Sequence, residues 1–395
     1  MIFFFFYLLF FIIINLKLYI YIYYFITYKE HNKKNILGLC LSGGNGGIEL
    51  YFINLINYFK NSNTNIYSIF KNNSLISDNI KVKKKIFIYK KINIFNILYY
   101  AYKISLFVTK NNINTIHIGW TNDLLLAVLI KKMCIQNIKI IYFRQMKITR
   151  FKTNIYHKFL YNNVDKILLI TEKLKLQTQK FIPYFNKKNL KVLKYGVKKQ
   201  TKISDINTII KHFNKNTFNI GIFSRIEEQK GQHLVIQAIN DLYLEKGNFF
   251  NLYIVGHIQN TIYYNKLKNL VKEYKLTNNI YFIEFIKDPI KIMEYFDLII
   301  LPTYEETFGL VIIEAMLMNT SIIGSNAGGV PEIITDKYNG LLFEPKNYKS
   351  LKKQINFLLE NPMLKDKMIK NAYNFVLKNY DYKYHFDTLN LLFNI

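Results

Sequence analysis

Short apolar runs recur along most of the chain, and stretches with a helical spacing of apolar residues separate them. The first series occupies residues 35–42, 65–70, 115–120, 138–143, 166–171 and 191–197. The second series occupies residues 218–224, 251–256, 279–285, 297–303, 320–325 and 340–345. Continuous apolar runs that alternate with helices indicate parallel strands buried on both faces. The pattern predicts an α/β protein with two doubly wound, Rossmann-like sheets.

The same pattern predicts the domain organisation. Residues 1–34 are a hydrophobic segment, and residues 35–200 and 201–380 each supply one sheet with its helices. Residues 199–217 are polar and are expected to connect the two. We expect the last stretch, 381–395, to be a helix that packs back on the N-terminal domain. Two similar open sheets facing one another also predict a central cleft, where ligands of such proteins bind.

The N-terminal segment is apolar or aromatic, with Lys17 as the one charge in its first 27 residues. It is about long enough to span a bilayer. Lys29, Lys33 and Lys34 follow it, and basic residues flank membrane spans on the cytoplasmic side. We therefore expect a single-pass or in-plane anchor that holds the protein on the cytoplasmic face of a membrane. An upstream start codon is the alternative explanation of this segment.

Charge is distributed unevenly over a chain whose net charge is +28. Residues 1–200 carry 32 Lys and Arg against 6 Asp and Glu, whereas residues 201–395 carry 22 against 20. A basic half favours an anionic partner, and no nucleic-acid-binding module is recognisable. An anionic membrane surface is the partner we expect. Two cysteines and seven scattered histidines provide no disulfide framework and no metal-ligand spacing, so no metal site is expected.

A glycine-rich loop follows the first predicted strand and precedes a helix. Backbone amides in such a loop can approach a phosphate. Glu49 stands where a dinucleotide-binding fingerprint has its last glycine, so this pattern does not favour a nicotinamide cofactor. A tight strand-to-helix turn and a ligand-lining loop both remain open as explanations. The candidate residues are Gly44, Asn45, Gly46 and Gly47.

Two cations lie at the start of the second domain. Arg225 follows a predicted strand, Lys230 lies five residues later, and Gly231 precedes a helix. Two cations beside a helix N-terminus suit a diphosphate group. A solvated surface pair is the simpler alternative.

Two carboxylates bracket an almost entirely apolar segment later in this domain. Glu306 is expected in the loop after a buried strand, and Glu314 in the second turn of the following helix. Ionised carboxylates only accept hydrogen bonds, so this pair suits the hydroxyls of a ligand. The macrodipole of the helix is an alternative explanation for Glu306 but not for Glu314. The backbone amides between them belong to Phe308, Gly309, Leu310 and Val311.

The segment EETFGLVIIEAM resembles the E-x7-E segment of the retaining glycosyltransferases of family 4, which have the two-domain GT-B fold. The resemblance runs over roughly residues 35–380 and includes SGGNGGIEL, KYGV, FSRIEEQKGQHLVIQA, SNAGGVPEII and NGLLFEP. It implies a nucleotide-sugar donor bound by the C-terminal domain and an acceptor bound by the N-terminal domain. It also implies retention of the anomeric configuration and catalysis without a metal ion.

The resemblance assigns roles to the candidate residues. Arg225 and Lys230 would hold the donor diphosphate, Glu306 the donor sugar and Glu314 the ribose. Arg225, Lys230 and Glu306 are the expected catalytic residues. The four amides named above, with Gly46 and Gly47, would complete the donor site. The expected acceptor-side residues are Gly44, Asn45, His117, Arg144 and Gln145.

The chain departs from the family pattern at Gln145, where the family often has a histidine. Glutamine can hydrogen-bond a hydroxyl but cannot carry a proton. Arg144 and Lys147 beside it would suit an anionic acceptor, and a core position is the alternative for His117. The expected function is a hexosyltransferase-type glycosyltransferase (EC 2.4) in glycan or lipopolysaccharide biosynthesis, acting on a lipid-linked or oligosaccharide acceptor. It needs no cofactor beyond the nucleotide-sugar. A nucleotide-sugar epimerase and an inactive membrane-bound scaffold are the alternatives.

Overall fold

The structure is a computed structural model of the 395-residue chain. It describes residues 34–198 and 216–394 apart from 45, 61, 63, 81–84, 89–91, 94, 248 and 287–288. It also describes Leu16, Lys17, Ile20 and Phe213. The chain divides into two compact units, Met1–Leu193 with Phe386–Ile395, and Lys194–His385.

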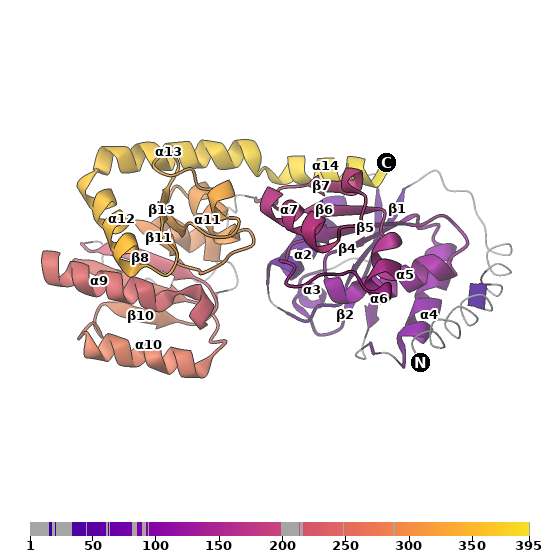
Figure 1. The fold of residues 1–395 in the computed structure, drawn as a ribbon, viewed down its shortest axis with the longest axis horizontal. Helices are drawn as coiled ribbons and strands as arrows, with labels where there is room; N and C mark the ends of the chain where they lie inside the picture. Colours follow the sequence, from indigo (N-terminus) through magenta and orange to yellow (C-terminus); the bar gives the residue numbers. More distant parts are fainter. Residues whose placement is uncertain are drawn as a thin grey trace. The chain divides into compact units, whose positions relative to one another are not determined.

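The first unit is built on a seven-stranded sheet in the order β3-β2-β1-β4-β5-β6-β7 (Figure 1). Every pairing is parallel, with Ile36 opposite Ile66 on one side and Thr115 on the other. The change of direction on either side of β1 defines a doubly wound sheet, in which ligands bind at the carboxyl ends of the strands. The strands are β1 (Asn35–Cys40), β2 (Asn65–Lys71), β3 (Lys85–Ile88), β4 (Thr115–Ile118), β5 (Lys139–Arg144), β6 (Lys166–Leu169) and β7 (Leu190–Val192).

Helices cover both faces of this sheet. One face is covered by α2 and by the part of α14 that begins at Phe386, whose ring contacts those of Tyr51 and Tyr58. The other face is covered by α4 and α5, which pack together. The helices are α2 (Gly47–Phe59), α3 (Leu75–Asn79), α4 (Ile97–Lys110), α5 (Leu124–Met133), α6 (Ile155–Asn162), α7 (Glu172–Phe181) and α14 (Tyr382–Asn394). Single 3-10 turns lie at η1 (Thr121–Asp123) and η2 (Lys187–Asn189).

The second unit is built on a six-stranded sheet in the order β10-β9-β8-β11-β12-β13, again parallel at every pairing. Its strands are β8 (Phe218–Phe223), β9 (Phe250–Val255), β10 (Ile280–Ile283), β11 (Leu298–Leu301), β12 (Ser321–Ser325) and β13 (Leu341–Phe343). Its helices are α9 (Gln232–Lys246), α10 (Thr261–Glu273), α11 (Leu310–Leu317), α12 (Tyr348–Glu360) and α13 (Pro362–Asn379). The 3-10 segments are η3 (Glu228–Lys230), η4 (Pro289–Tyr295) and η5 (Val330–Glu332).

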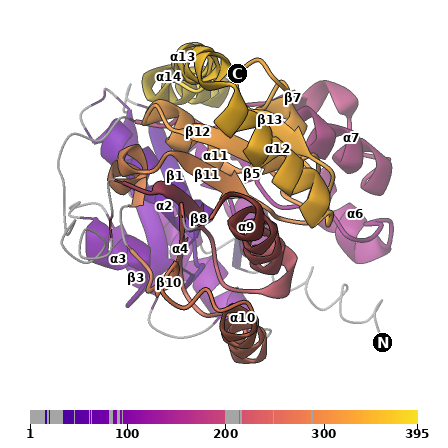
Figure 2. The same cartoon turned by 90° about the vertical axis from the view of Figure 1, so that its left-hand side faces the viewer.

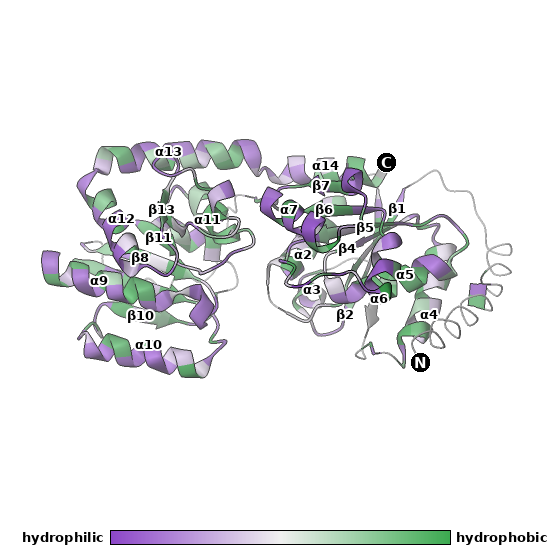
Figure 3. Cartoon of the chain, viewed as in Figure 1, coloured by the Kyte–Doolittle hydropathy of each residue, from purple (hydrophilic) through white to green (hydrophobic). Residues whose placement is uncertain are grey.

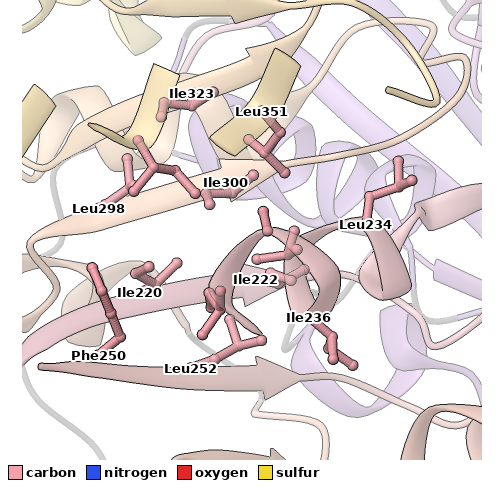
Figure 4. Packing of buried hydrophobic residues seen from close by; sticks show 14 of the residues in the cluster. Ile220, Ile222, Leu234, Ile236, Phe250, Leu252, Leu298, Ile300, Ile323 and Leu351 are labelled. Atoms are coloured by element: carbon pink, nitrogen blue, oxygen red, sulfur yellow. The ribbon is translucent and has the colours of Figure 1, made fainter. Parts of the chain in front are cut away.

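Alternate residues of the central strand face the two helix layers of the second unit. Ile220 and Ile222 of β8 join a buried cluster with Leu234 and Ile236 of α9, shown in Figure 4. Gly221, between them, faces Phe296 on the opposite side. Helix α9 lies between α10 and α12 (Figure 2), while α11 packs with α13 and η4. The outer helices are two-sided, with hydrophilic and hydrophobic stripes along α10 and α13 (Figure 3).

These two parallel sheets confirm the predicted α/β fold, and they contain one strand that was not expected. Strand β3 occupies residues 85–88, between stretches rich in lysine. The expected N-terminal hydrophobic segment and most of the polar connection 199–217 lie outside the described residues, so both stay predictions. In the part of the chain that the structure describes, no helix has the length and apolarity needed to cross a bilayer.

Candidate active site

The connection from β8 to α9 places Arg225 at the surface and holds its backbone firmly. The amide Nε2 of the fully buried Gln232 donates hydrogen bonds to the Arg225 carbonyl, at 2.8 Å, and to Ser224 Oγ, at 3.1 Å. The Arg225 side chain is 58% exposed, and its Nη2 lies 3.0 Å from Oε1 of Glu227. The backbone of Arg225 is therefore fixed, while its guanidinium group is exposed and accessible to a ligand.

A glycine lets helix α9 begin directly against the end of β11. Gly231 has a φ of +68°, and a Cβ atom there would lie 2.2 Å from the Pro302 carbonyl oxygen. Glycine favours this left-handed conformation, and only glycine tolerates so close an approach. The close contact brings Lys230, the residue before it, to the β11–α11 connection.

Two further hydrogen bonds join the β8–α9 and β11–α11 connections. The Gln229 carbonyl accepts from the Tyr304 backbone N–H, at 2.9 Å, and from Thr303 Oγ1, at 3.2 Å. Next to this junction, Nζ of Lys230 lies 2.9 Å from Oε2 of Glu306. Less than a quarter of either side chain is exposed, so water screens this ion pair weakly. The structure thus brings together two of the predicted residues, one from each connection.

The carboxylate of Glu306 has a second, local partner. Its Oε1 accepts from the Thr307 backbone N–H at 3.1 Å. Its backbone carbonyl accepts from the Gly329 N–H at 2.7 Å, in the connection that follows β12. Glu306 is therefore held by its side chain and its backbone.

Helix α11 begins beside this carboxylate without a side-chain cap among the described residues. Its N-cap, Gly309, has a φ of +96°, and its first turn carries no acid. The neighbouring Phe308 is buried, and its ring contacts those of Tyr195 and Tyr380. The amides of Leu310 and Val311 belong to the first turn, where backbone N–H groups have no partner inside the helix. This helix end suits an anion or a polar oxygen.

Glu314 is the fifth residue of α11 and lies in its second turn, as expected. Its side chain is partly buried, whereas its neighbours Ile313 and Ala315 are fully buried. A carboxylate here lies about one turn along the helix from its N-terminus. Glu314 is therefore part of α11, and Glu306 lies in the loop directly before it.

His233, which no sequence pattern singles out, also contributes to this region. Its Nδ1 lies 2.8 Å from the Tyr263 hydroxyl and its Nε2 3.0 Å from the Tyr304 hydroxyl. Burial, with a smaller effect from the Lys266 ammonium, lowers the pKa of His233. The imidazole thus connects α9, α10 and the β11–α11 connection. In the sequence, the one indication of this role is that His233 is the second residue of the helix that follows Lys230 and Gly231.

In the first unit, Glu49 organises the glycine-rich loop. Its buried carboxylate accepts hydrogen bonds from the Ser42 hydroxyl and from the Gly46 N–H, the latter at 2.8 Å. Gly44, Gly46 and Gly47 are exposed, while Asn45 lies outside the described residues. At Gly47 an added Cβ would meet no atom within 4 Å. The residue that replaces the last glycine of the fingerprint therefore caps α2 and closes the loop.

Two of the expected acceptor-side residues, His117 and Arg144, are buried in the first unit, and His117 thus has the core position that was its alternative. His117 is fully buried, with Nε2 3.0 Å from the Tyr51 hydroxyl and its ring against Phe393. Arg144 is 4% exposed, and its guanidinium donates to the Tyr142 hydroxyl at 3.0 Å and to the Lys147 carbonyl at 3.2 Å. Packing against aromatic neighbours explains both positions. Gln145, next in the chain, is partly exposed.

Metal-ligating side chains do not gather in the described part of the chain. No three His, Cys, Asp or Glu residues there are close enough to hold a metal ion. The independence from metal ions stays a prediction.

Residues 205–375 match the family model described as "Glycosyl transferases group 1". The matched residues all belong to the second unit, Lys194–His385. The uncharacterized glycosyltransferase MJ1178 of Methanocaldococcus jannaschii is 28% identical over 234 residues, which are 58% of this chain and 59% of that protein. The chain thus matches somewhat more than half the length of this relative.

Two solved structures have the same fold. A glycosyltransferase from Rickettsia africae superposes with a TM-score of 0.81 at 22% identity, covering 92% of this chain and 98% of that one. HepE of Anabaena, in complex with UDP, superposes with a TM-score of 0.78 at 18% identity, covering 91% and 99%. The two units have the GT-B fold of glycosyltransferases.

Proposed function

We propose that this chain is a retaining glycosyltransferase of family 4 that transfers a hexose-type sugar from a nucleotide-sugar. The observation that carries the proposal is the Lys230–Glu306 pair beside the start of α11. It gathers a cation, a carboxylate and a helix N-terminus at the carboxyl ends of two adjacent strands. A diphosphate and a sugar need these three kinds of group. The match of residues 205–375 to the glycosyl transferases group 1 supports it.

In the proposed donor complex, Arg225 and Lys230 bind the diphosphate. The amides of Leu310 and Val311 add donors at the positive end of the helix. Glu306 accepts from hydroxyls of the donor sugar, and Glu314 accepts from the ribose. UDP is the first nucleotide to test, because HepE, which has this fold, binds it.

The proposed reaction breaks the bond between the anomeric carbon and a phosphate oxygen, and forms a bond from that carbon to an acceptor oxygen on the same face. The acceptor proton passes to the departing phosphate oxygen. Negative charge grows on the leaving diphosphate, where Arg225, Lys230 and the helix amides stabilise it. The anomeric carbon becomes positively charged in the transition state, and the carboxylate of Glu306 favours that charge.

We further propose that the acceptor is lipid-linked and that the enzyme works on the cytoplasmic face of a membrane. The support is the excess of 32 basic over 6 acidic residues in residues 1–200, together with the apolar N-terminal segment. Anionic headgroups attract such a charge.

The experiment is transfer from radiolabelled UDP-, GDP- and ADP-sugars to an extract of bacterial membrane lipids. The expected result is label in the organic phase with one nucleotide class, abolished by Glu306→Gln, and a product with the donor's anomeric configuration by NMR. Label released as free sugar isomer would favour an epimerase. The absence of both transfer and donor binding would favour a scaffold without activity. That result would overturn the proposal.

A further inference from the structure

The connection from β5 to α6, together with the first turn of α6, exposes large apolar side chains in the first unit. Outside this region the exposed apolar residues are scattered over many elements. Here they gather within a few residues of one another, at 42–58% exposure. They are Met146, Phe151, Ile155 and Tyr156. A cluster of exposed apolar groups in so short a stretch marks an interaction site.

Cations alternate with these apolar residues. Lys147, Arg150 and Lys152 lie between them, and residues 124–164 contain no Asp or Glu. Burial, followed by the charges of Arg150 and Arg144, lowers the pKa of Lys152. Burial and then the Lys152 and Arg150 charges likewise lower the pKa of His157. The cations are thus close enough to repel one another, and an anionic partner would relieve that repulsion.

The connection is held in place, so its side chains are presented in a defined way. The Lys152 N–H donates to the Phe181 carbonyl at 2.9 Å, and the Tyr184 hydroxyl donates to the Lys152 carbonyl at 2.8 Å. The rings of Phe151 and Phe181 lie 4.9 Å apart. At the other end Asn154 caps α6, accepting from the His157 N–H at 2.9 Å. These contacts tie the connection to the end of α7 and the residues that follow it.

We propose that these residues form a docking surface for a membrane that carries anionic lipid headgroups. We call it the β5–α6 surface and define it by its apolar residues Met146, Phe151, Ile155 and Tyr156 and its cations Lys147, Arg150 and Lys152. The apolar side chains enter the boundary between headgroups and acyl chains, and the cations contact lipid phosphates.

The aliphatic members favour lipid over nucleic acid as the partner. Met146 and Ile155 offer neither a hydrogen bond nor a ring for base stacking, on which single-stranded nucleic-acid sites depend. Both suit an acyl environment. The inference rests on the membrane partner proposed above, and it is independent of donor binding by the second unit.

The test uses the full chain with a tryptophan at the centre of the surface. Phe151→Trp is titrated with vesicles of brominated phosphatidylcholine and phosphatidylglycerol, because bromine quenches only a tryptophan that reaches the acyl chains. Phe285→Trp in the second unit is the matched control, since Phe285 is 52% exposed and Phe151 56%. The unsubstituted protein gives the background from Trp120.

The expected result is strong quenching in Phe151→Trp and only background quenching in Phe285→Trp. Adding Arg150→Ala or Lys152→Ala should weaken the apparent vesicle affinity about fivefold for each charge removed. Equal quenching of the two tryptophan variants would overturn the proposal. So would a Phe151→Trp signal that responds to single-stranded RNA and not to anionic vesicles. Nucleotide-sugar binding, measured on the same samples, shows separately whether the donor site is intact.

Discussion

The ammonium of Lys230 lies 2.9 Å from the carboxylate of Glu306, and the two residues come from connections that follow neighbouring strands. The pair neutralises two charges that are mostly shielded from water. It also sets the distance between a group suited to phosphate and a group suited to sugar hydroxyls. A substitution of either residue therefore changes the electrostatic environment of the other.

Replacing Lys230 tests its proposed role at the diphosphate. Lys230→Ala should lower kcat/KM about 10²- to 10³-fold, because a preorganised cation at the leaving group is lost. The exposed Lys272, on α10 of the same unit, provides the control Lys272→Ala. Steady-state kinetics with the nucleotide-sugar that the transfer assay identifies as donor measures both. Full activity in Lys230→Ala would contradict the assignment.

The Lys230–Glu306 pair should also couple in stability. Lys230→Ala leaves the partly buried Glu306 carboxylate without its cation. The loss of unfolding free energy in the double variant, which also carries Glu306→Gln, should therefore be smaller than the sum of the losses in the two single variants. Urea unfolding of the single and double variants measures the coupling. Strictly additive changes would show that the contact contributes nothing.

Gly328 lies against the backbone of Glu306, and its substitution should damage both stability and donor binding. A Cβ atom there would lie 1.7 Å from the Glu306 carbonyl oxygen, at a φ of +62°. Gly247→Ala is the matched control, because its φ is +82° and no atom lies within 4 Å of an added Cβ. The control should lose about 1–3 kcal/mol from backbone strain alone. Gly328→Ala should lose clearly more and bind donor weakly; equal losses in thermal unfolding would refute the clash.

The stability of the second unit should depend on pH through His385. Burial lowers the pKa of His385 to about 4. An unfolded histidine titrates near 6.5, so between these values the unfolded state binds the extra proton. The folded state is therefore fully favoured above pH 6.5 and loses up to about 3 kcal/mol as the pH falls to 4.

The control for this effect is His385→Asn, which keeps a donor for the Lys194 carbonyl, 2.6 Å from Nδ1 of His385. Other groups titrate in the same range, so the difference between the two proteins is the relevant quantity. The free energies of unfolding should diverge as the pH falls from 6.5 to 4. Parallel curves would show that His385 does not titrate as its burial requires.

Deleting residues 1–34 tests the lipid-linked acceptor. The shortened protein should retain transfer to a soluble acceptor and lose transfer to lipid-linked acceptors in vesicles, because the apolar segment no longer holds it at the membrane. Transfer assays with both acceptors measure the ratio. Undiminished transfer to the lipid-linked acceptor would refute a role for this segment.

The sheets were largely predictable from the sequence, because buried parallel strands are continuous apolar runs. All six strands of the second unit fall on the runs predicted there. Strand β3 was missed because lysines flank its four residues and hide the short apolar core. An edge strand tolerates such charges, since one side of it has no neighbour.

The sequence predicted which residue types form the candidate site, but it did not predict most of the contacts between them. The sequence places Lys230 and Glu306 in separate loops, and their ion pair spans 76 residues. It depends on Gly231 meeting the end of β11, which no local pattern reveals. His233 was missed for the same reason, since its partners Tyr263 and Tyr304 are distant in the chain. The burial of His117 and Arg144 was not evident from the sequence, because a polar residue of a strand can also find its partners inside the fold.

Donor binding tests the central proposal most directly. Thermal unfolding of the full chain would be measured against UDP-, GDP- and ADP-sugars, with Glu314→Ala and the control Lys272→Ala in parallel. The predicted result is stabilisation by one nucleotide class that is lost in Glu314→Ala and kept in Lys272→Ala. Stabilisation by none of them, or stabilisation that survives in Glu314→Ala, would contradict the donor site described above.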